Sequence, residues 1–138
     1  MKRRLLMLSV SLVAGIVLGM IGYQALNSQQ QAVKRTVLLK TDLEGIEGRD
    51  GNVVIVEIAP GAESGKHYHP GHEIAYIQEG SATIEIEGKK PVTYKRGAVA
   101  HLTPKQAHNV KNNSKTAPVK ALVFAIYEKG QPEVTPVK

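Results

Sequence analysis

Apolar and polar residues alternate with a period of two along much of the chain after residue 33. The clearest case is the segment 82–87, Ala-Thr-Ile-Glu-Ile-Glu, in which every second side chain is apolar. Successive side chains of an extended chain point to opposite faces, so this pattern predicts β-strands with one buried face. Alternation or β-branched runs predict further strands at residues 52–58, 73–78, 92–94, 98–102 and 119–127.

Turn residues separate these segments at short intervals, as in Pro60-Gly61, Pro70-Gly71 and Asn112-Asn113. No helical pattern longer than two turns is present from residue 33 onward. Short strands joined by such turns need closure, or a second sheet, to bury one face. We therefore expect an all-β fold, an antiparallel β-barrel or jelly roll.

The first 26 residues follow a different pattern. Three basic residues, Lys2, Arg3 and Arg4, precede a run over residues 5–26 that contains no charge. A spanning helix needs about 20 apolar residues, whereas the apolar part of a signal peptide has about 7–15. The run therefore predicts one N-terminal hydrophobic helix that anchors the protein in a membrane, with a signal sequence as the alternative. A buried core helix is less favoured because the run has no polar face.

The basic N-terminus also predicts an orientation. Basic residues beside a membrane span stay in the cytoplasm, so the folded part is expected to face the periplasm or exterior from the inner membrane. If the segment is cleaved, the protein is secreted to the periplasm. We expect residues 27–33 to be a polar linker, residues 34–130 the folded domain and residues 131–138 a flexible tail.

Composition narrows the chemistry of this domain. The chain has no cysteine, which excludes disulfides and thiolate ligands and leaves histidine and carboxylate groups. Half of the net charge of +6 comes from the three basic residues among the first four, so the rest of the chain is only moderately basic. With one phenylalanine and no tryptophan, the chain lacks aromatic residues on which bases could stack. Nucleic-acid binding is therefore not expected.

The five histidines suggest a metal site. His67 and His69 are two residues apart, so both imidazoles project from the same face of an extended chain. Glu73 follows across a turn, and His108 must come from a different strand. Neutral imidazoles with one carboxylate suit one divalent transition metal: Fe, Mn, Ni, Cu, Co or Zn.

The spacing of these residues resembles a known family. The positions Gly61, His67, His69, Glu73 and Gly80 match the first motif of the cupin superfamily without a gap or substitution. The resemblance is to small single-domain cupins that bind metal.

The second cupin motif is met in part. Gly97, His108 and Asn112 have the family's spacing, whereas Thr103 stands where the family usually has proline and Lys105 where it usually has glycine. These two changes affect the loop before His108 and not the histidine itself.

The resemblance implies a cupin-type antiparallel β-barrel with a six-stranded core, often dimeric, so that a homodimer is a further expectation. It implies that His67, His69, Glu73 and His108 are the metal ligands. Two other histidines, His72 and His101, are not motif positions and are expected at the surface. Asn112 is expected to tighten the turn after the strand of His108.

For function, we expect a metal-dependent enzyme, or an enzyme-like binder, of a small organic molecule. The first hypothesis is a dioxygenase similar to the quercetinase-like cupins, in which Glu73 is a metal ligand that can detach and act as a base. The alternative is a non-catalytic periplasmic module that binds a metal or small ligand, which the membrane anchor favours. A third hypothesis is a structural metal that only stabilises the barrel.

Overall fold

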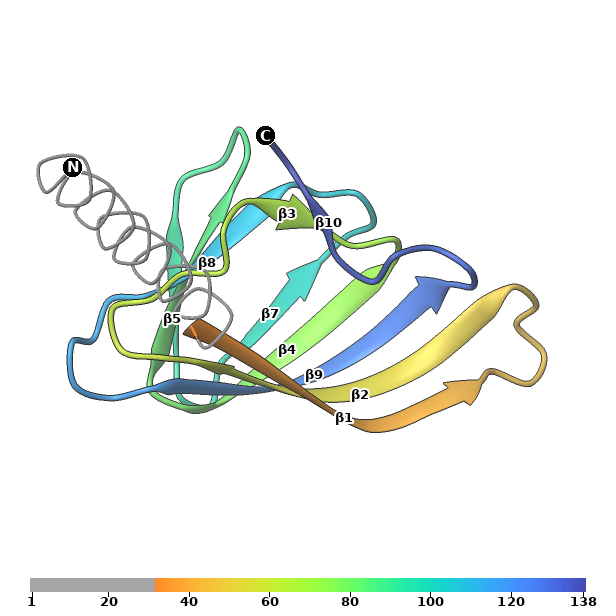
Figure 1. The fold of residues 1–138 in the computed structure, drawn as a ribbon, viewed down its shortest axis with the longest axis horizontal. Coiled ribbons are helices and arrows are strands. Elements are labelled where there is room, and N and C mark those ends of the chain that lie inside the picture. The colour runs from red at the N-terminus through yellow and green to blue at the C-terminus, as the bar shows by residue number, and fades with distance from the viewer. Residues whose placement is uncertain (1–31) are drawn as a thin grey trace, which may run out of the picture. The chain divides into compact units, whose positions relative to one another are not determined.

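The computed structural model describes residues 32–138, which form two five-stranded antiparallel sheets (Figure 1). The strands are β1 (Val33–Asp42), β2 (Arg49–Ile58), β3 (His67–Tyr68), β4 (His72–Glu79), β5 (Ser81–Ile86), β6 (Val92–Lys95), β7 (Val99–Leu102), β8 (His108–Asn112), β9 (Val119–Glu128) and β10 (Thr135–Pro136). The sheet orders are β1-β2-β9-β4-β7 and β10-β3-β8-β5-β6. The predicted all-β jelly roll is confirmed.

The membrane prediction falls on residues that the structure does not describe. Residues 1–31 lie outside the described part, and so does the predicted N-terminal helix. Among residues 32–138, no helix is both long enough and apolar enough to cross a membrane. Anchoring and cleavage therefore stay predictions.

The core follows from the alternation along the strands. In β9 every second side chain is buried, from Val119 to Tyr127, and the strand pairs with β2 on one side and β4 on the other. The same period places Ile77 of β4 and Ala82 of β5 in the core. Because both sheets turn their apolar faces inward, the core lies between them.

Strand β1 was not predicted. Its sequence does not alternate, and none of its residues is fully buried. It pairs with β2 alone at the edge of its sheet, with an irregularity between Val37 and Leu39. Backbone pairing to a neighbouring strand forms this element, and such pairing leaves little trace in the local sequence.

The segment 131–138, for which we expected flexibility, contains β10. Thr135 pairs with Tyr68 and Pro136 with His67, so β10 extends the sheet beside β3. The Val137 amide also donates to the Lys66 carbonyl oxygen at 2.9 Å. The C-terminal segment therefore lies next to the strand that carries the first motif histidine.

The outer face of the sheet that contains β4 and β9 is partly apolar. Ile74, Tyr76, Phe124 and Ile126 are each more than two-fifths exposed. The homodimer that the family resemblance implies stays a prediction.

Candidate metal centre

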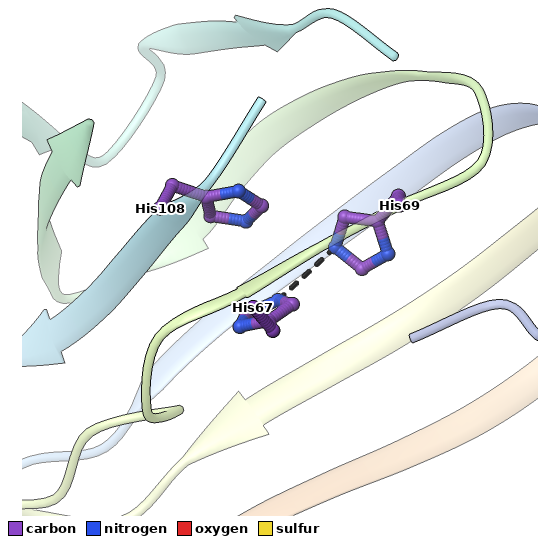
Figure 2. A group of neighbouring side chains, drawn as sticks. All are labelled: His67, His69 and His108. Carbon is purple, nitrogen blue, oxygen red and sulfur yellow. Dashed lines mark hydrogen bonds between the residues drawn. The ribbon is translucent and has the colours of Figure 1, made fainter. Parts of the chain in front are cut away.

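Three histidines meet between the sheets (Figure 2). His67 belongs to β3, His69 follows it directly, and His108 begins β8 opposite His67. Their exposed fractions are 9%, 4% and 2%, and one nitrogen from each lies within 4.8 Å of the others. The structure therefore brings together the three histidines that the sequence selected.

Each imidazole is oriented by the main chain. In each ring, Nδ1 donates a hydrogen bond to a backbone carbonyl oxygen. His67 donates to Gly65 at 2.8 Å, His69 to Glu133 at 2.6 Å and His108 to Gln106 at 2.8 Å. Because a carbonyl oxygen only accepts, Nδ1 carries the hydrogen and Nε2 keeps its lone pair. Partners of this kind orient metal-binding histidines in proteins.

The free lone pairs point at one another. The Nε2 atoms of His67 and His69 are 3.1 Å apart, as the dashed line in Figure 2 marks. Two lone pairs at this distance repel, whereas a cation between them would be bound by both. Burial lowers the pKa of His69 and of His108 to about 4, so both rings are neutral at pH 7. The donor set therefore fits a divalent transition metal.

Glu73 reaches this group from the opposite sheet. It is an inward residue of β4, 6% exposed, and its Oε2 atom lies 3.2 Å from Nε2 of His69. Its Oε1 atom accepts a hydrogen bond from the Tyr127 hydroxyl. Burial raises the pKa of Glu73, and the Tyr127 hydrogen bond and the Arg35 charge oppose this shift. Glu73 is thus placed beside the three histidines, and its ligation of a metal stays a prediction.

A close backbone contact positions Glu73. Gly71 lies in the turn between His69 and Glu73, and a Cβ atom built there would be 1.8 Å from the Ile126 carbonyl oxygen. The residue after it, His72, begins β4 opposite Ile126. The absence of a side chain at residue 71 lets the start of β4 lie directly against β9, next to the three histidines.

The loop before His108 has one strained residue. Lys105 has a φ of 58°, and its amide donates to the His69 carbonyl oxygen at 2.9 Å. This is the position where the family usually has glycine. A left-handed conformation costs a lysine about 1 kcal/mol or more relative to glycine, so the substitution leaves strain in the loop.

Replacing Lys105 by glycine is expected to stabilise the protein by up to about 1 kcal/mol, because relief of strain outweighs the added freedom of the unfolded chain. Urea denaturation measures this as a higher midpoint. Gly88, another left-handed turn residue with open space around it, provides the comparison, since Gly88→Lys should lower the midpoint. An unchanged or lower midpoint for Lys105→Gly would contradict the strain.

Two other histidines lie on the outer face. His72 and His101 are exposed, stack on one another and bring Nδ1 and Nε2 to 3.1 Å. Their expected surface position is confirmed.

Asn112 closes the turn after β8. Its amide donates to the carbonyl oxygens of Ile58, Ala59 and Ala117, at 3.1, 3.1 and 2.9 Å. Its oxygen accepts from the Ser114 amide at 3.0 Å. The predicted role of Asn112 is confirmed.

The group of three histidines and Glu73 opens into a cavity of about 290 Å³. His67, His69, Glu73 and His108 form its polar wall. Most of the other lining residues are aliphatic, among them Val56, Ile58, Ala75, Ile84, Val110 and Val123. A polar wall in an apolar cavity is typical of a site for a small organic molecule.

Sequence reasoning missed three residues of this region. Tyr127 holds Glu73, Glu133 holds His69 through its carbonyl oxygen, and Arg35 lines the cavity. Tyr127 belongs to β9, Glu133 to the segment that precedes β10, and Arg35 to β1. None lies in a motif; the period of β9 marks Tyr127 as an inward residue but not as a partner of Glu73.

The histidine pKa values predict how stability depends on pH without metal. Between the ordinary value of 6.5 and about 4, the unfolded chain binds protons on His69 and His108 that the folded chain does not bind. The free energy of unfolding should therefore fall by about 3–4 kcal/mol from pH 7 to pH 5. The raised pKa of Glu73 acts in the opposite direction and reduces the loss. Urea denaturation of chelator-treated protein tests this, and greater stability at pH 5 would contradict it.

Solved structures share this fold at low identity. A cupin superfamily protein from Desulfitobacterium hafniense is 14% identical, with a TM-score of 0.58, and the match covers 70% of this chain and 78% of that one. A cupin-like protein from Thermotoga maritima is 22% identical, with a TM-score of 0.61 and coverages of 76% and 75%. The DMSP lyase DddQ from Ruegeria pomeroyi is 19% identical, with a TM-score of 0.61 and coverages of 77% and 52%.

Identities of this size show a shared fold and not a shared activity. No curated protein matches the chain. The family described as "Cupin domain" matches residues 54–125, from Val54 in β2 to Ala125 in β9. This match includes both histidine motifs and more than half of the sequence, and the chain therefore belongs to the cupin family.

Proposed function

We propose that this protein binds one divalent transition metal through His67, His69 and His108, with Glu73 as a fourth ligand, and acts on a small organic molecule in the adjoining cavity. The observation that carries the proposal is the convergence of three buried Nε2 atoms on the wall of an apolar cavity. Four protein ligands would leave positions on a six-coordinate ion for a substrate or water.

The protein's own groups are suited to moving a proton. Burial raises the pKa of Glu73, so its carboxyl group can take up a proton more readily than an exposed one. The pKa of Tyr127 is also raised, by burial first and by Glu73 next, so its hydroxyl stays a donor. Tyr127 therefore orients one oxygen of Glu73 while the other faces His69.

A bound transition metal would supply Lewis-acid or redox chemistry. The aliphatic walls would exclude water and hold an apolar substrate beside the polar wall. The reaction that we propose first is dioxygenase-like oxidation of a small phenolic compound. The fold likeness to a DMSP lyase supports small-molecule chemistry in general, without favouring that reaction.

Oxygen uptake tests this proposal. The full-length protein is loaded in turn with Fe, Mn, Ni, Cu, Co or Zn and mixed with phenolic compounds in an oxygen-electrode cell. We expect uptake with at least one metal, and Glu73→Gln should reduce the rate while the metal is retained. The same substitution at Glu79, an exposed residue of the same strand, is the control.

If every metal-loaded sample binds phenolic compounds without consuming oxygen, the dioxygenase proposal fails and a non-catalytic binding module remains. If the protein binds neither metal nor ligand, both proposals fail.

A further inference from the structure

One arginine lines the cavity together with the histidines, Glu73 and the aliphatic residues. Arg35 is the one lysine or arginine among the cavity-lining residues within 32–138. It lies on the inward side of β1, two residues after Val33 and opposite Val56 of β2, and both of these neighbours line the same cavity. The Arg35 side chain is 26% exposed, so most of it is removed from solvent. A largely covered guanidinium needs an anionic partner.

Glu133 satisfies this need only in part. Its Oε2 atom lies 3.5 Å from the Arg35 guanidinium, whereas its Oε1 atom accepts from Nζ of Lys40 at 2.9 Å. Charge-assisted hydrogen bonds are usually about 2.7–2.9 Å long, so Lys40 is the closer partner of this carboxylate. Burial raises the pKa values of Glu73 and Tyr127, and the guanidinium also lies close enough to both for its charge to oppose this rise. Arginine has five N–H donors in a planar fork, and these contacts use only part of that capacity.

The cavity thus has two polar regions with different chemistry. One is the group of His67, His69 and His108 with Glu73, and the other is the guanidinium of Arg35. Aliphatic side chains of β2, β4 and β9 make up most of the remaining wall. A neutral hydrocarbon would leave the Arg35 donors unused, whereas a molecule with one anionic group would use them.

We propose that Arg35 binds a carboxylate of the ligand, which is therefore a small, largely apolar monocarboxylic acid. This inference rests on the proposed function, because it specifies the molecule that lies beside the metal centre. A cavity of about 290 Å³ is at the lower end of the range of roughly 300–1,000 Å³ for ligand pockets, so the acid is small. Its apolar part contacts the aliphatic wall.

The test uses matched acids and amides. Phenylacetate and phenylacetamide, and hexanoate and hexanamide, are titrated into the full-length, metal-loaded protein, with binding followed by NMR chemical shifts. We expect each acid to bind about tenfold or more tightly than its amide, because a charged partner strengthens the hydrogen bonds of the guanidinium. Arg35→Gln should lower the affinity for the acids by a similar factor and leave the affinity for the amides unchanged.

Two further variants sharpen the result. Lys34→Gln removes the same charge from the outward side of β1, where the side chain is 71% exposed, and should leave acid binding unchanged. Glu133→Gln removes the carboxylate that competes for Arg35 and keeps the carbonyl oxygen that orients His69. Acid binding to Glu133→Gln should be several-fold tighter than to the parent.

Equal affinities for acids and amides, no binding of any acid, or an equal loss in Arg35→Gln and Lys34→Gln would overturn the inference. Metal content, measured on the same samples by elemental analysis, separates this failure from that of the proposed function. A protein that holds metal and does not prefer acids has the metal centre without the carboxylate site.

Discussion

His108→Ala is expected to reduce bound metal from about one ion per chain to a trace after dialysis. His108 is 2% exposed, and burial keeps its imidazole neutral at pH 7 by lowering its pKa to about 4. Loss of a residue that only hydrogen-bonds to a ligand lowers metal affinity about 10–100-fold, and removal of a ligand itself should lower it more. Elemental analysis of the full-length protein, purified without a metal-binding tag, measures this directly.

His101→Ala is the matched control. This histidine is exposed on the outer face of β7, so its removal should leave the metal content unchanged. His67→Ala should behave like His108→Ala, because both rings belong to the same group. Retention of metal in the His108 variant, or equal losses in the His101 and His108 variants, would contradict the proposal that His108 is a metal ligand.

The second large effect is expected for Gly71→Ala. The added Cβ atom would lie 1.8 Å from the Ile126 carbonyl oxygen and 2.9 Å from Cα of Tyr127, both of them backbone atoms that cannot rotate away. The turn must therefore move away from β9, with loss of pairing at the start of β4. We expect the free energy of unfolding to fall by about 3 kcal/mol or more, at the upper end of overpacking effects.

Urea denaturation of Gly71→Ala measures the loss, and Gly88→Ala provides the comparison. Gly88 has a φ of 75° and nothing within 4 Å of its Cβ position, so its substitution carries conformational strain of about 1 kcal/mol and no clash. If the two variants were equally stable, the close approach of β4 and β9 would be disproved. Because residue 71 lies between His69 and Glu73, Gly71→Ala should lower both stability and metal affinity, whereas Gly88→Ala should leave metal affinity unchanged.

The sequence predicted the strands in which buried and exposed side chains alternate. It also predicted which site residues lie together when they are close to each other in the chain. The segments 73–78 and 119–127 have a clear inward period, and both are strands. His67 and His69 could be paired because the period of a strand relates residues two apart. Strand β1 was not recognised because both of its faces are largely uncovered and its pairing with β2 is a backbone interaction.

The residues that contact His69 and Glu73 could not be found from local patterns. Tyr127 contacts a residue 54 positions earlier, and Glu133 accepts a hydrogen bond from one 64 positions earlier. Arg35 and Glu133 are 98 positions apart. Such contacts depend on the order of strands in the sheets, which a local pattern does not contain. His108 was identified through the family motif, because that motif includes a histidine far along the chain whose position near His67 and His69 no local pattern predicts.

The pairing of His67 with His108 also has a consequence for the rate of unfolding. A metal bound by both would join two points of the chain that are otherwise connected through β4, β5, β6 and β7. In a chain without cysteine, this is the kind of link that a disulfide provides elsewhere. Opening the jelly roll would then require metal–nitrogen bonds to break, so loading should lengthen the lifetime of the native state and slow its degradation by proteases.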